Sequence, residues 1–321
     1  MRTALRAAVV ETPCTCGELV QGVLDGEPFL VSCPIDRYSR VKLALDSEST
    51  IGPPSPKARR AAEATLASLG LSRMSFSLEV SCPLPPSKGF GTSTADVAGA
   101  IVAAAAAAGA ALAPLEIARL AVSVEPSDGT MFPGLAVFDH RSASHGIVLG
   151  SAPPLSVAVL EFEGIVDTLE YNSHLDLGYL RSREPEYARA VELLRHGLEG
   201  NRWDLVGQAA TLSARINQRL LPKSELERVI RLGEEHGALG VCAAHSGTLL
   251  GVLFSPENER PARDLLAVAA DRLDGLESCW STRMVNGGAR LVSVGAAPEP
   301  WVGDIPSSIG TTETRRTPRF T

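Results

Sequence analysis

Residues 86–94 form a turn rich in glycine and hydroxyl side chains, and they are the first candidates for chemistry. The turn consists of Pro86, Ser87, Lys88, Gly89, Phe90, Gly91, Thr92, Ser93 and Thr94. Gly89 and Gly91 let the backbone turn tightly and approach a ligand closely. The alanine-rich run from Ala95 to about Ala111 predicts a helix directly afterwards. Because a helix N-terminus presents unpaired N–H groups and the positive end of the helix dipole, we predict that a phosphate binds here.

The same turn also allows a purely structural interpretation. Thr92, Ser93 and Thr94 are good N-cap residues, so the turn could simply begin a helix. It lacks the two common nucleotide signatures as well. A P-loop has its lysine after the glycines, whereas Lys88 precedes them, and a dinucleotide fingerprint needs a third glycine. Taken by itself, the turn is as compatible with a structural role as with phosphate binding.

A compact acidic turn follows a predicted helix over residues 115–124. It holds two carboxylates three residues apart, Glu125 and Asp128. The turn could be a solvated loop in which Asp128 caps the local backbone, or it could supply acid–base chemistry. The spacing alone does not decide between these interpretations.

Two further segments carry polar side chains among small residues. Glu18 lies in a predicted loop over residues 13–22, and His245 and Ser246 lie in a predicted turn between two short strands. Each segment could be an ordinary turn or could face a ligand. His140 has no metal-ligand spacing to other histidines, so we expect an ordinary surface or core residue there.

Hydrophobic periodicity predicts mostly strands in the first eighty residues and a mixture of helices and strands afterwards. The predicted strands are residues 7–10, 29–34, 38–45, 74–82, 135–139, 146–149, 156–162 and 289–294, with two more inside 240–254. The predicted helices are residues 57–69, 95–111, 115–124, 187–198, 203–220, 224–236 and 260–273. Ser224 and Glu227 have the spacing of a capping box. This order of elements indicates an α+β fold.

The consecutive prolines Pro153 and Pro154 mark the predicted boundary between two domains, residues 1–152 and 153–297. Residues 298–321 are rich in Pro, Ser, Thr and Arg, which predicts a flexible tail. A net charge of −7 gives no general basic field for nucleic acid. Residues 97–115 contain no charged residue, but they are mostly Ala and Gly, so we expect a buried helix rather than a membrane span.

Cysteine usage bears on the cellular compartment. The chain has 6 cysteines with no repeated Cys-x-x-Cys spacing, and no secretion signal is evident near the first residue. Such scattered cysteines are typical of reduced thiols. We therefore expect a cytoplasmic location.

The glycine turn resembles the phosphate-binding motif of the GHMP kinases, a superfamily that includes galactokinase, homoserine kinase and mevalonate kinase. Their pattern is Pro-x-x-x-Gly-Leu-Gly-Ser-Ser-Ala-Ala, and this sequence has Pro85-x-x-x-Gly89-Phe90-Gly91-Thr92-Ser93-Thr94-Ala95. Asp128 falls where these kinases have a catalytic aspartate, and residues 244–251 fall where they have a third, glycine-rich motif. The resemblance implies an N-terminal ribosomal-protein-like α/β domain that binds ATP and a C-terminal ferredoxin-like α+β domain.

Further blocks resemble the L-threonine kinases of cobalamin biosynthesis, a branch of this superfamily. They include Cys16-Gly17-Glu18-Leu19-Val20-Gln21-Gly22, Ser123-Val124-Glu125-Pro126-Ser127-Asp128, Phe138-Asp139-His140, Leu220-Leu221-Pro222-Lys223 and Ala244-His245-Ser246-Gly247. The resemblance implies that ATP phosphorylates the hydroxyl of L-threonine to O-phospho-L-threonine, with Mg²⁺ as cofactor. A kinase for another small alcohol, such as homoserine, and a non-catalytic relative that keeps the fold as a binding module remain alternatives.

The resemblance also implies roles at the phosphate end of the site. Residues 86–94 would hold the ATP phosphates, with Lys88 as a point charge that assists catalysis. Asp128 would orient the substrate hydroxyl or accept its proton. Ser93 and Glu125 would be Mg²⁺ ligands, since hydroxyl and carboxylate oxygens suit this cation.

At the substrate end, roles follow from polarity alone. Glu18 would bind the ammonium of the amino acid, and His245 or Ser246 its carboxylate. The expected partners are therefore ATP and a small molecule, with neither nucleic acid nor a membrane. A homodimer is also compatible with the sequence.

Overall fold

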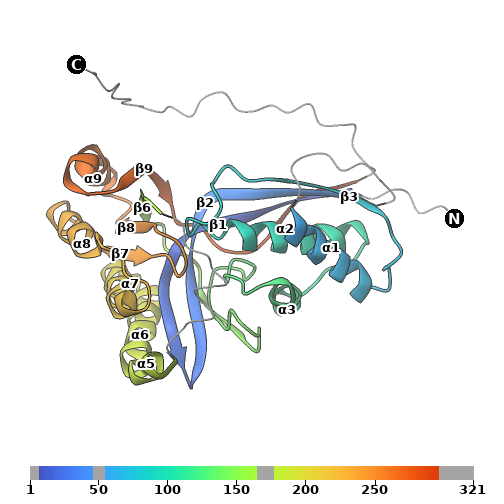
Figure 1. Cartoon of the computed structure of the whole chain (residues 1–321), viewed down its shortest axis with the longest axis horizontal. Helices are drawn as coiled ribbons and strands as arrows, with labels where there is room; N and C mark the ends of the chain where they lie inside the picture. Colours follow the sequence, from blue (N-terminus) through green and yellow to red (C-terminus); the bar gives the residue numbers. More distant parts are fainter. Residues whose placement is uncertain (1–6, 46–54, 165–176, 296–321) are drawn as a thin grey trace, which may run out of the picture.

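A 10-stranded sheet runs through the computed structural model, which describes residues 7–45, 55–164 and 177–295 (Figure 1). The strands are β1 (Ala7–Leu24), β2 (Glu27–Leu45), β3 (Phe76–Ser81), β4 (Leu135–Phe138), β5 (Gly146–Gly150), β6 (Ser156–Phe162), β7 (Gly240–Ala243), β8 (Leu250–Phe254), β9 (Leu276–Arg283) and β10 (Arg290–Gly295). Their order is β5-β4-β2-β1-β7-β8-β6-β9, while β10 pairs with β1 and β3 pairs with β2. Neighbouring strands pair in the antiparallel sense.

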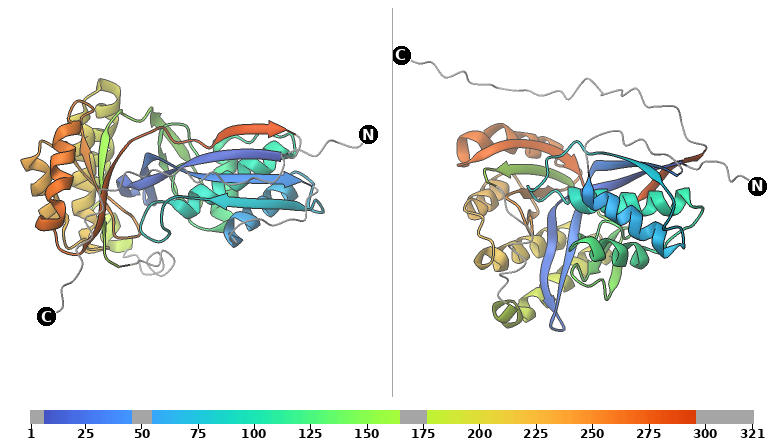
Figure 2. Two further views of the ribbon diagram at one scale, coloured as in Figure 1. Left: turned by 90° about the horizontal axis from the view of Figure 1, so that it is seen from above. Right: turned by 45° about the vertical axis from the view of Figure 1, so that its right-hand side comes forward.

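The helices form two groups. They are α1 (Pro56–Ser68), α2 (Thr92–Ala107), α3 (Pro114–Val124), α5 (Leu177–Ser182), α6 (Glu184–Gly200), α7 (Trp203–Ile216), the short 3-10 helix η1 (Asn217–Arg219), α8 (Leu226–Glu235) and α9 (Glu259–Arg272). Figure 2 shows the helices of the first half at one end of the molecule and those of the second half at the other. The predicted α+β class is confirmed. The predicted tail over 298–321 lies outside the described residues.

The strands β1 and β2 form one long hairpin joined by a two-residue turn. Asp25 and Gly26 have φ values of 50° and 78°, as a type I′ turn requires. The predicted loop over 13–22 is wrong, and so is the predicted break between residues 34 and 38, because both segments belong to the hairpin. Register shifts between Pro13 and Val20 let β1 carry proline and glycine without ending.

The helix α2 is the centre of the first half. It is buried along nearly its whole length and packs against α1, β1 and β2. Its small side chains make this possible, since a Cβ on Gly99 would lie 2.8 Å from Cγ2 of Val41. In the described parts of the chain, no helix is long and apolar enough to cross a membrane.

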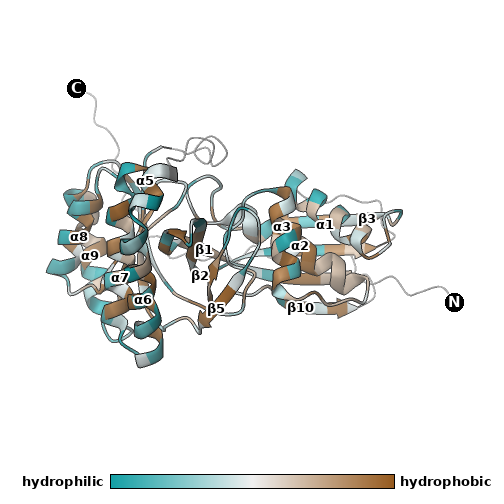
Figure 3. Cartoon of the chain, turned by 90° about the horizontal axis from the view of Figure 1, so that it is seen from below, coloured by the Kyte–Doolittle hydropathy of each residue, from teal (hydrophilic) through white to brown (hydrophobic). Residues whose placement is uncertain are grey.

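In the second half, helices cover the strands β6, β7, β8 and β9. Hydrophobic residues of α6 and α7 share a core cluster with β1, and those of α8 and α9 share another with β6, β7 and β8. Hydrophilic and hydrophobic residues alternate along these helices, as expected for helices with one face on a sheet (Figure 3). The two strands predicted inside 240–254 are confirmed as β7 and β8.

Two details of the second half differ from the prediction. The predicted capping box of Ser224 and Glu227 is wrong, because α8 begins after Glu225. The carboxylate of Glu227 instead accepts hydrogen bonds of 2.8 and 2.9 Å from Arg215. The sequence did not predict the strand β9, because polar and apolar residues do not alternate along it. The strand β10 pairs with β1, so the chain returns to the first half.

The division into 1–152 and 153–297 stays a prediction, since one sheet includes strands of both segments.

Candidate active site

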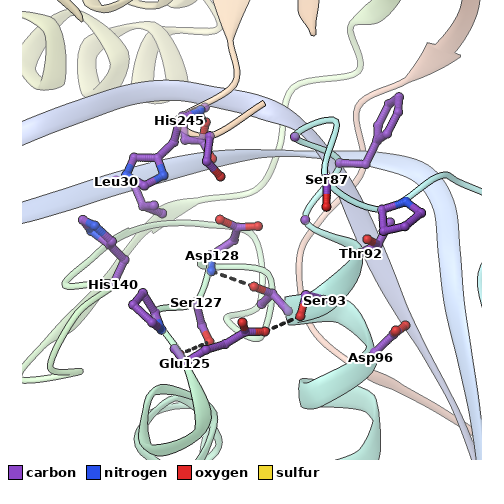
Figure 4. Close-up of a pocket in the computed structure, with 18 of the residues that line it drawn as sticks. Leu30, Ser87, Thr92, Ser93, Asp96, Glu125, Ser127, Asp128, His140 and His245 are labelled. Carbon is purple, nitrogen blue, oxygen red and sulfur yellow. Dashed lines mark hydrogen bonds between the residues drawn. The ribbon is translucent and has the colours of Figure 1, made fainter. Parts of the chain in front are cut away.

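A pocket of about 250 Å³ lies between the glycine turn, the acidic turn after α3, the β1–β2 hairpin and the β7–β8 turn (Figure 4). The predicted site residues that line it are Glu18, Pro86, Ser87, Gly89, Phe90, Gly91, Thr92, Ser93, Thr94, Glu125, Asp128, His245 and Ser246. Leu30, Lys57, Asp96, Pro126, Ser127 and His140 also line it. Segments far apart in sequence therefore converge on one cavity, and most of the predicted residues are in it.

The glycine turn needs its glycines for both conformation and space. Gly89 and Gly91 have φ values of 106° and 61°. A Cβ on Gly89 would lie 2.4 Å from Cβ of Ala244, and one on Gly91 would lie 2.4 Å from Oδ2 of Asp128. Both contacts are much closer than side-chain atoms tolerate, so the turn packs directly on the other two motifs.

The helix α2 begins at Thr92, and Gly91 is its N-cap residue. Thr92, Ser93 and Thr94 thus lie in the first turn of the helix, and the expectation that they cap it is wrong. Their backbone N–H groups lie at the positive end of a 16-residue helix that borders the pocket. This is the arrangement in which helix N-termini bind phosphate.

The structure gives Lys88 a different environment from the predicted one. Its ammonium donates hydrogen bonds to the carbonyl of Phe162, at 3.0 Å, and to the carboxylate of Glu277. Its carbonyl accepts the N–H of Thr248 at 3.0 Å. Lys88 is not among the described residues that line the pocket. The geometry therefore does not support its expected contact with phosphate.

Lys57, at the start of α1, is the lysine that reaches the pocket, and sequence reasoning missed it. Its ammonium pairs with Glu125 at 2.5 Å and lies 3.5 Å from the hydroxyl of Ser93. A positive charge therefore faces the pocket beside the first turn of α2. The sequence offered no signal for this role, because a lysine at a helix start is ordinarily a solvated residue.

Ser93 and Glu125, the predicted Mg²⁺ ligands, meet at the pocket. The Ser93 hydroxyl donates a hydrogen bond to the Glu125 carboxylate, which is largely buried (Figure 4). Within residues 7–45, 55–164 and 177–295, no group of three or more His, Cys, Asp or Glu side chains could hold a metal ion alone. Mg²⁺ commonly binds through one or two protein oxygens together with phosphates and water. The pair therefore fits a cation that a nucleotide would help to hold.

Asp128 is held firmly in the acidic turn. Its N–H donates to the Thr94 hydroxyl at 3.0 Å, and the N–H of Gly129 donates to the Ser32 hydroxyl at 3.0 Å. Burial raises the pKa of Asp128 to about 6, with a further rise from the negative charge of Glu125, while the Thr94 hydroxyl opposes the shift. The turn faces the pocket rather than solvent, so the interpretation as a solvated loop is wrong.

Glu18 and His245 are joined across the pocket. The carboxylate of Glu18, only 4% exposed, accepts the backbone N–H of His245 at 2.6 Å. Burial and the charge of Asp128 raise the pKa of Glu18 well above its usual value. Lys223, nearby, donates to the Gly247 carbonyl, and burial lowers its pKa to about 8.

His140 is the second residue that sequence reasoning missed. It is 4% exposed and lines the pocket, with its ring centre 5.1 Å from that of His245. Burial lowers the pKa of His140 to about 4, so the ring is neutral near pH 7. The block Phe138-Asp139-His140 could have signalled its place in the site, whereas histidine spacing could not.

Comparisons with known proteins agree with this geometry. The family description "GHMP kinases N terminal domain" matches residues 57–135, and "GHMP kinases C terminal" matches residues 190–270. An L-threonine kinase from Citrobacter freundii is 36% identical over 249 residues, which cover 77% of this chain and 86% of the relative. The chain belongs to the GHMP kinase family. An L-threonine kinase from Salmonella typhimurium (strain LT2) is 33% identical over 295 residues, covering 88% of this chain and 95% of the relative.

Solved structures share the fold of this GHMP kinase. A homoserine kinase from Cytophaga hutchinsonii matches with a TM-score of 0.66 at 17% identity, covering 91% of this chain and 98% of that one. A mevalonate diphosphate decarboxylase from Staphylococcus aureus matches with a TM-score of 0.69 at 12% identity, covering 90% and 98%. At these identities the likeness shows the fold alone. The predicted two-domain GHMP kinase fold is confirmed.

Membership in the family gives the class of reaction. The GHMP kinase described here is a phosphotransferase that uses ATP and has an alcohol group as acceptor. Phosphoryl transfer relies mainly on positioning and on neutralising phosphate charge. The pocket has groups for both tasks. Helix N–H groups and Lys57, which can neutralise phosphate charge, lie at one side of Asp128, while Glu18 and the histidines, which can position an acceptor, line the other part of the pocket.

Proposed function

We propose that this GHMP kinase phosphorylates the hydroxyl of L-threonine, giving O-phospho-L-threonine and ADP as a step that feeds cobalamin biosynthesis. The observation that carries the proposal is the 36% and 33% identity to proteins named L-threonine kinase over most of both chains. The pocket also suits a small polar substrate, since its volume is about 250 Å³ and its walls carry carboxylates and imidazoles.

At the nucleotide end, residues 86–94 and the first turn of α2 receive the phosphates of ATP. Their backbone N–H groups and the helix dipole favour a polyanion. Ser93 and Glu125 would hold Mg²⁺ together with the nucleotide, and the ion would supply positive charge against the phosphates. Lys57, rather than Lys88, supplies the protein's positive charge on this side.

Asp128 acts on the acceptor hydroxyl. An alcohol is a weak nucleophile, and a neighbouring carboxylate helps by orienting it and by accepting its proton late in the transfer. The raised pKa of about 6 leaves Asp128 mostly ionised near pH 7, while making it a stronger base than an exposed aspartate. Hydrogen bonds from the acidic turn to Thr94 and Ser32 keep the carboxylate in place.

At the acceptor end, Glu18 binds the ammonium of the amino acid, and His245 or Ser246 contributes to binding its carboxylate. Glu18 is positioned by the N–H of His245 and lies close enough to Asp128 for their charges to interact. A substrate ammonium between these carboxylates would relieve their repulsion. Binding would therefore lower the pKa of Glu18 toward its usual value.

A panel of alcohols tests the proposal. Purified protein with ATP and Mg²⁺ should release ADP with L-threonine at a kcat/KM at least tenfold above that with L-serine or L-homoserine. A higher value with homoserine would favour the runner-up, a kinase for another small alcohol. Complete absence of ADP release with every alcohol would favour a non-catalytic binding protein. A cytoplasmic location and a homodimer stay predictions, for fractionation and sedimentation to check.

A further inference from the structure

His140 lies at the substrate end of the pocket, in the turn that connects β4 and β5. In Figure 4, His140, Leu30 and His245 are on one side of Asp128, and Ser87, Thr92, Ser93 and Asp96 are on the other. If phosphate occupies the side of Ser93, the acceptor must approach Asp128 from the side of His140. This argument rests on the proposed kinase function.

The side chain of His140 has unsatisfied hydrogen-bonding capacity. Among the described residues, neither Nδ1 nor Nε2 has a hydrogen-bond partner, although the residue is only 4% exposed. A buried polar group without a partner is costly, and such groups in folded proteins call for an explanation. A substrate that completes the hydrogen bond would provide one.

The backbone around His140 is fixed before any substrate arrives. The His140 carbonyl accepts the N–H of Ser127 at 3.0 Å, which ties it to the turn that holds Asp128. The preceding Asp139 accepts N–H groups of Arg141, Ser142 and Ser144, each at 3.1 Å. His140 and Asp128 are therefore held at a set separation, as a preorganised site requires.

The charges of the pocket indicate which substrate group His140 would meet. Glu18 and Asp128 are acceptors and suit the ammonium or the hydroxyl of an amino acid. Lys57 lies with Ser93 and Glu125 at the phosphate side, and the ammonium of Lys223 is directed to the Gly247 carbonyl. A carboxylate only accepts hydrogen bonds, so at the substrate end it needs N–H or O–H donors. A neutral imidazole carries one.

We propose that His140 is a specificity-determining residue whose ring N–H binds the α-carboxylate of the amino acid substrate. The contact makes the enzyme prefer alcohols that carry a carboxylate next to the amine. His245, in edge-on contact with the His140 ring, keeps that ring in its orientation.

The test compares two substrates in one set of variants. (R)-1-aminopropan-2-ol is L-threonine without its carboxylate and keeps the amine and the hydroxyl. His140→Phe keeps a ring against His245 but removes the donor, and His140→Gln keeps a donor. For L-threonine, we expect kcat/KM to fall about 10- to 100-fold in His140→Phe and to recover in part in His140→Gln. For the aminopropanol, both variants should equal the unmodified enzyme.

Controls separate the outcomes. The control variant His196→Gln, on the exposed surface of α6, should leave kcat/KM unchanged for both substrates. The KM for ATP should stay unchanged and the melting temperature should not fall in the His140 variants, which excludes misfolding. Equal losses for both substrates, or no loss for L-threonine, would overturn the role in carboxylate recognition. If the unmodified enzyme fails to phosphorylate L-threonine but phosphorylates another amino acid alcohol, the proposed function fails, and the same comparison with that substrate and its decarboxylated form still tests His140.

Discussion

Replacing Asp128 by Asn should lower activity and raise stability at the same time. The carboxylate is ionised above about pH 6, although burial and the charge of Glu125 both disfavour the ionised form. Asparagine has nearly the same shape and no charge. Loss of the carboxylate should reduce kcat by about 100-fold or more, the usual contribution of a positioned acid–base group.

The gain in stability follows from the pKa. A rise from 3.8 to about 6 corresponds to at most about 3 kcal/mol above pH 6, at roughly 1.4 kcal/mol per pKa unit, and water in the pocket reduces this to about 1–3 kcal/mol. Because the folded-state pKa is raised, the penalty is absent below the unfolded pKa and grows as pH rises toward 6. The stabilisation should therefore be full at pH 8 and about half as large at pH 5.

Urea unfolding at both pH values and steady-state kinetics measure these effects. Asp271→Asn, on the exposed surface of α9, is a matched control and should change neither quantity. An Asp128→Asn variant with normal turnover would remove Asp128 from the mechanism. A variant that is less stable at pH 8 would refute the reasoning about its burial.

Four other substitutions test the nucleotide side. Ser93→Ala should raise the Mg²⁺ concentration needed for half-maximal rate several-fold, because it removes one of two oxygen ligands; an unchanged metal titration would count against this ligand. Gly91→Ala should lower kcat/KM for ATP at least tenfold, since φ is 61° and the new Cβ would lie 2.4 Å from Oδ2 of Asp128; normal kinetics would show that the turn relaxes freely. Lys57→Met should raise the KM for ATP about tenfold, while Lys88→Met should alter melting temperature more than KM; the reverse order would restore Lys88 to the phosphate site.

The local parts of the site were predictable from sequence. Glycines before an alanine-rich run predict a turn and a helix from conformational preference alone, and the structure has both. The residues that complete the pocket beside this turn, such as Asp128 and His245, come from distant segments of the chain. Only the resemblance to a family brought these residues together before the structure did.

Two failures have clear physical reasons. The sequence predicts a loop over residues 13–22 of β1 because Pro13 and Gly17 usually end strands, whereas register shifts with β2 absorb both here. The family resemblance implies that Lys88 contacts phosphate as a point charge. Its side chain is turned toward Phe162 and Glu277 by contacts that span more than 70 residues, and no local pattern encodes that direction.

The identity of the phosphorylated product tests the central claim most directly. The protein would be incubated with ATP, Mg²⁺ and an equimolar mixture of L-threonine, L-serine and L-homoserine, and the products separated and identified by mass and by comparison with standards. We expect O-phospho-L-threonine as the main product, formed in a one-to-one ratio with ADP. A mixture dominated by O-phosphohomoserine, or ADP without any phosphorylated amino acid, would contradict the proposed function.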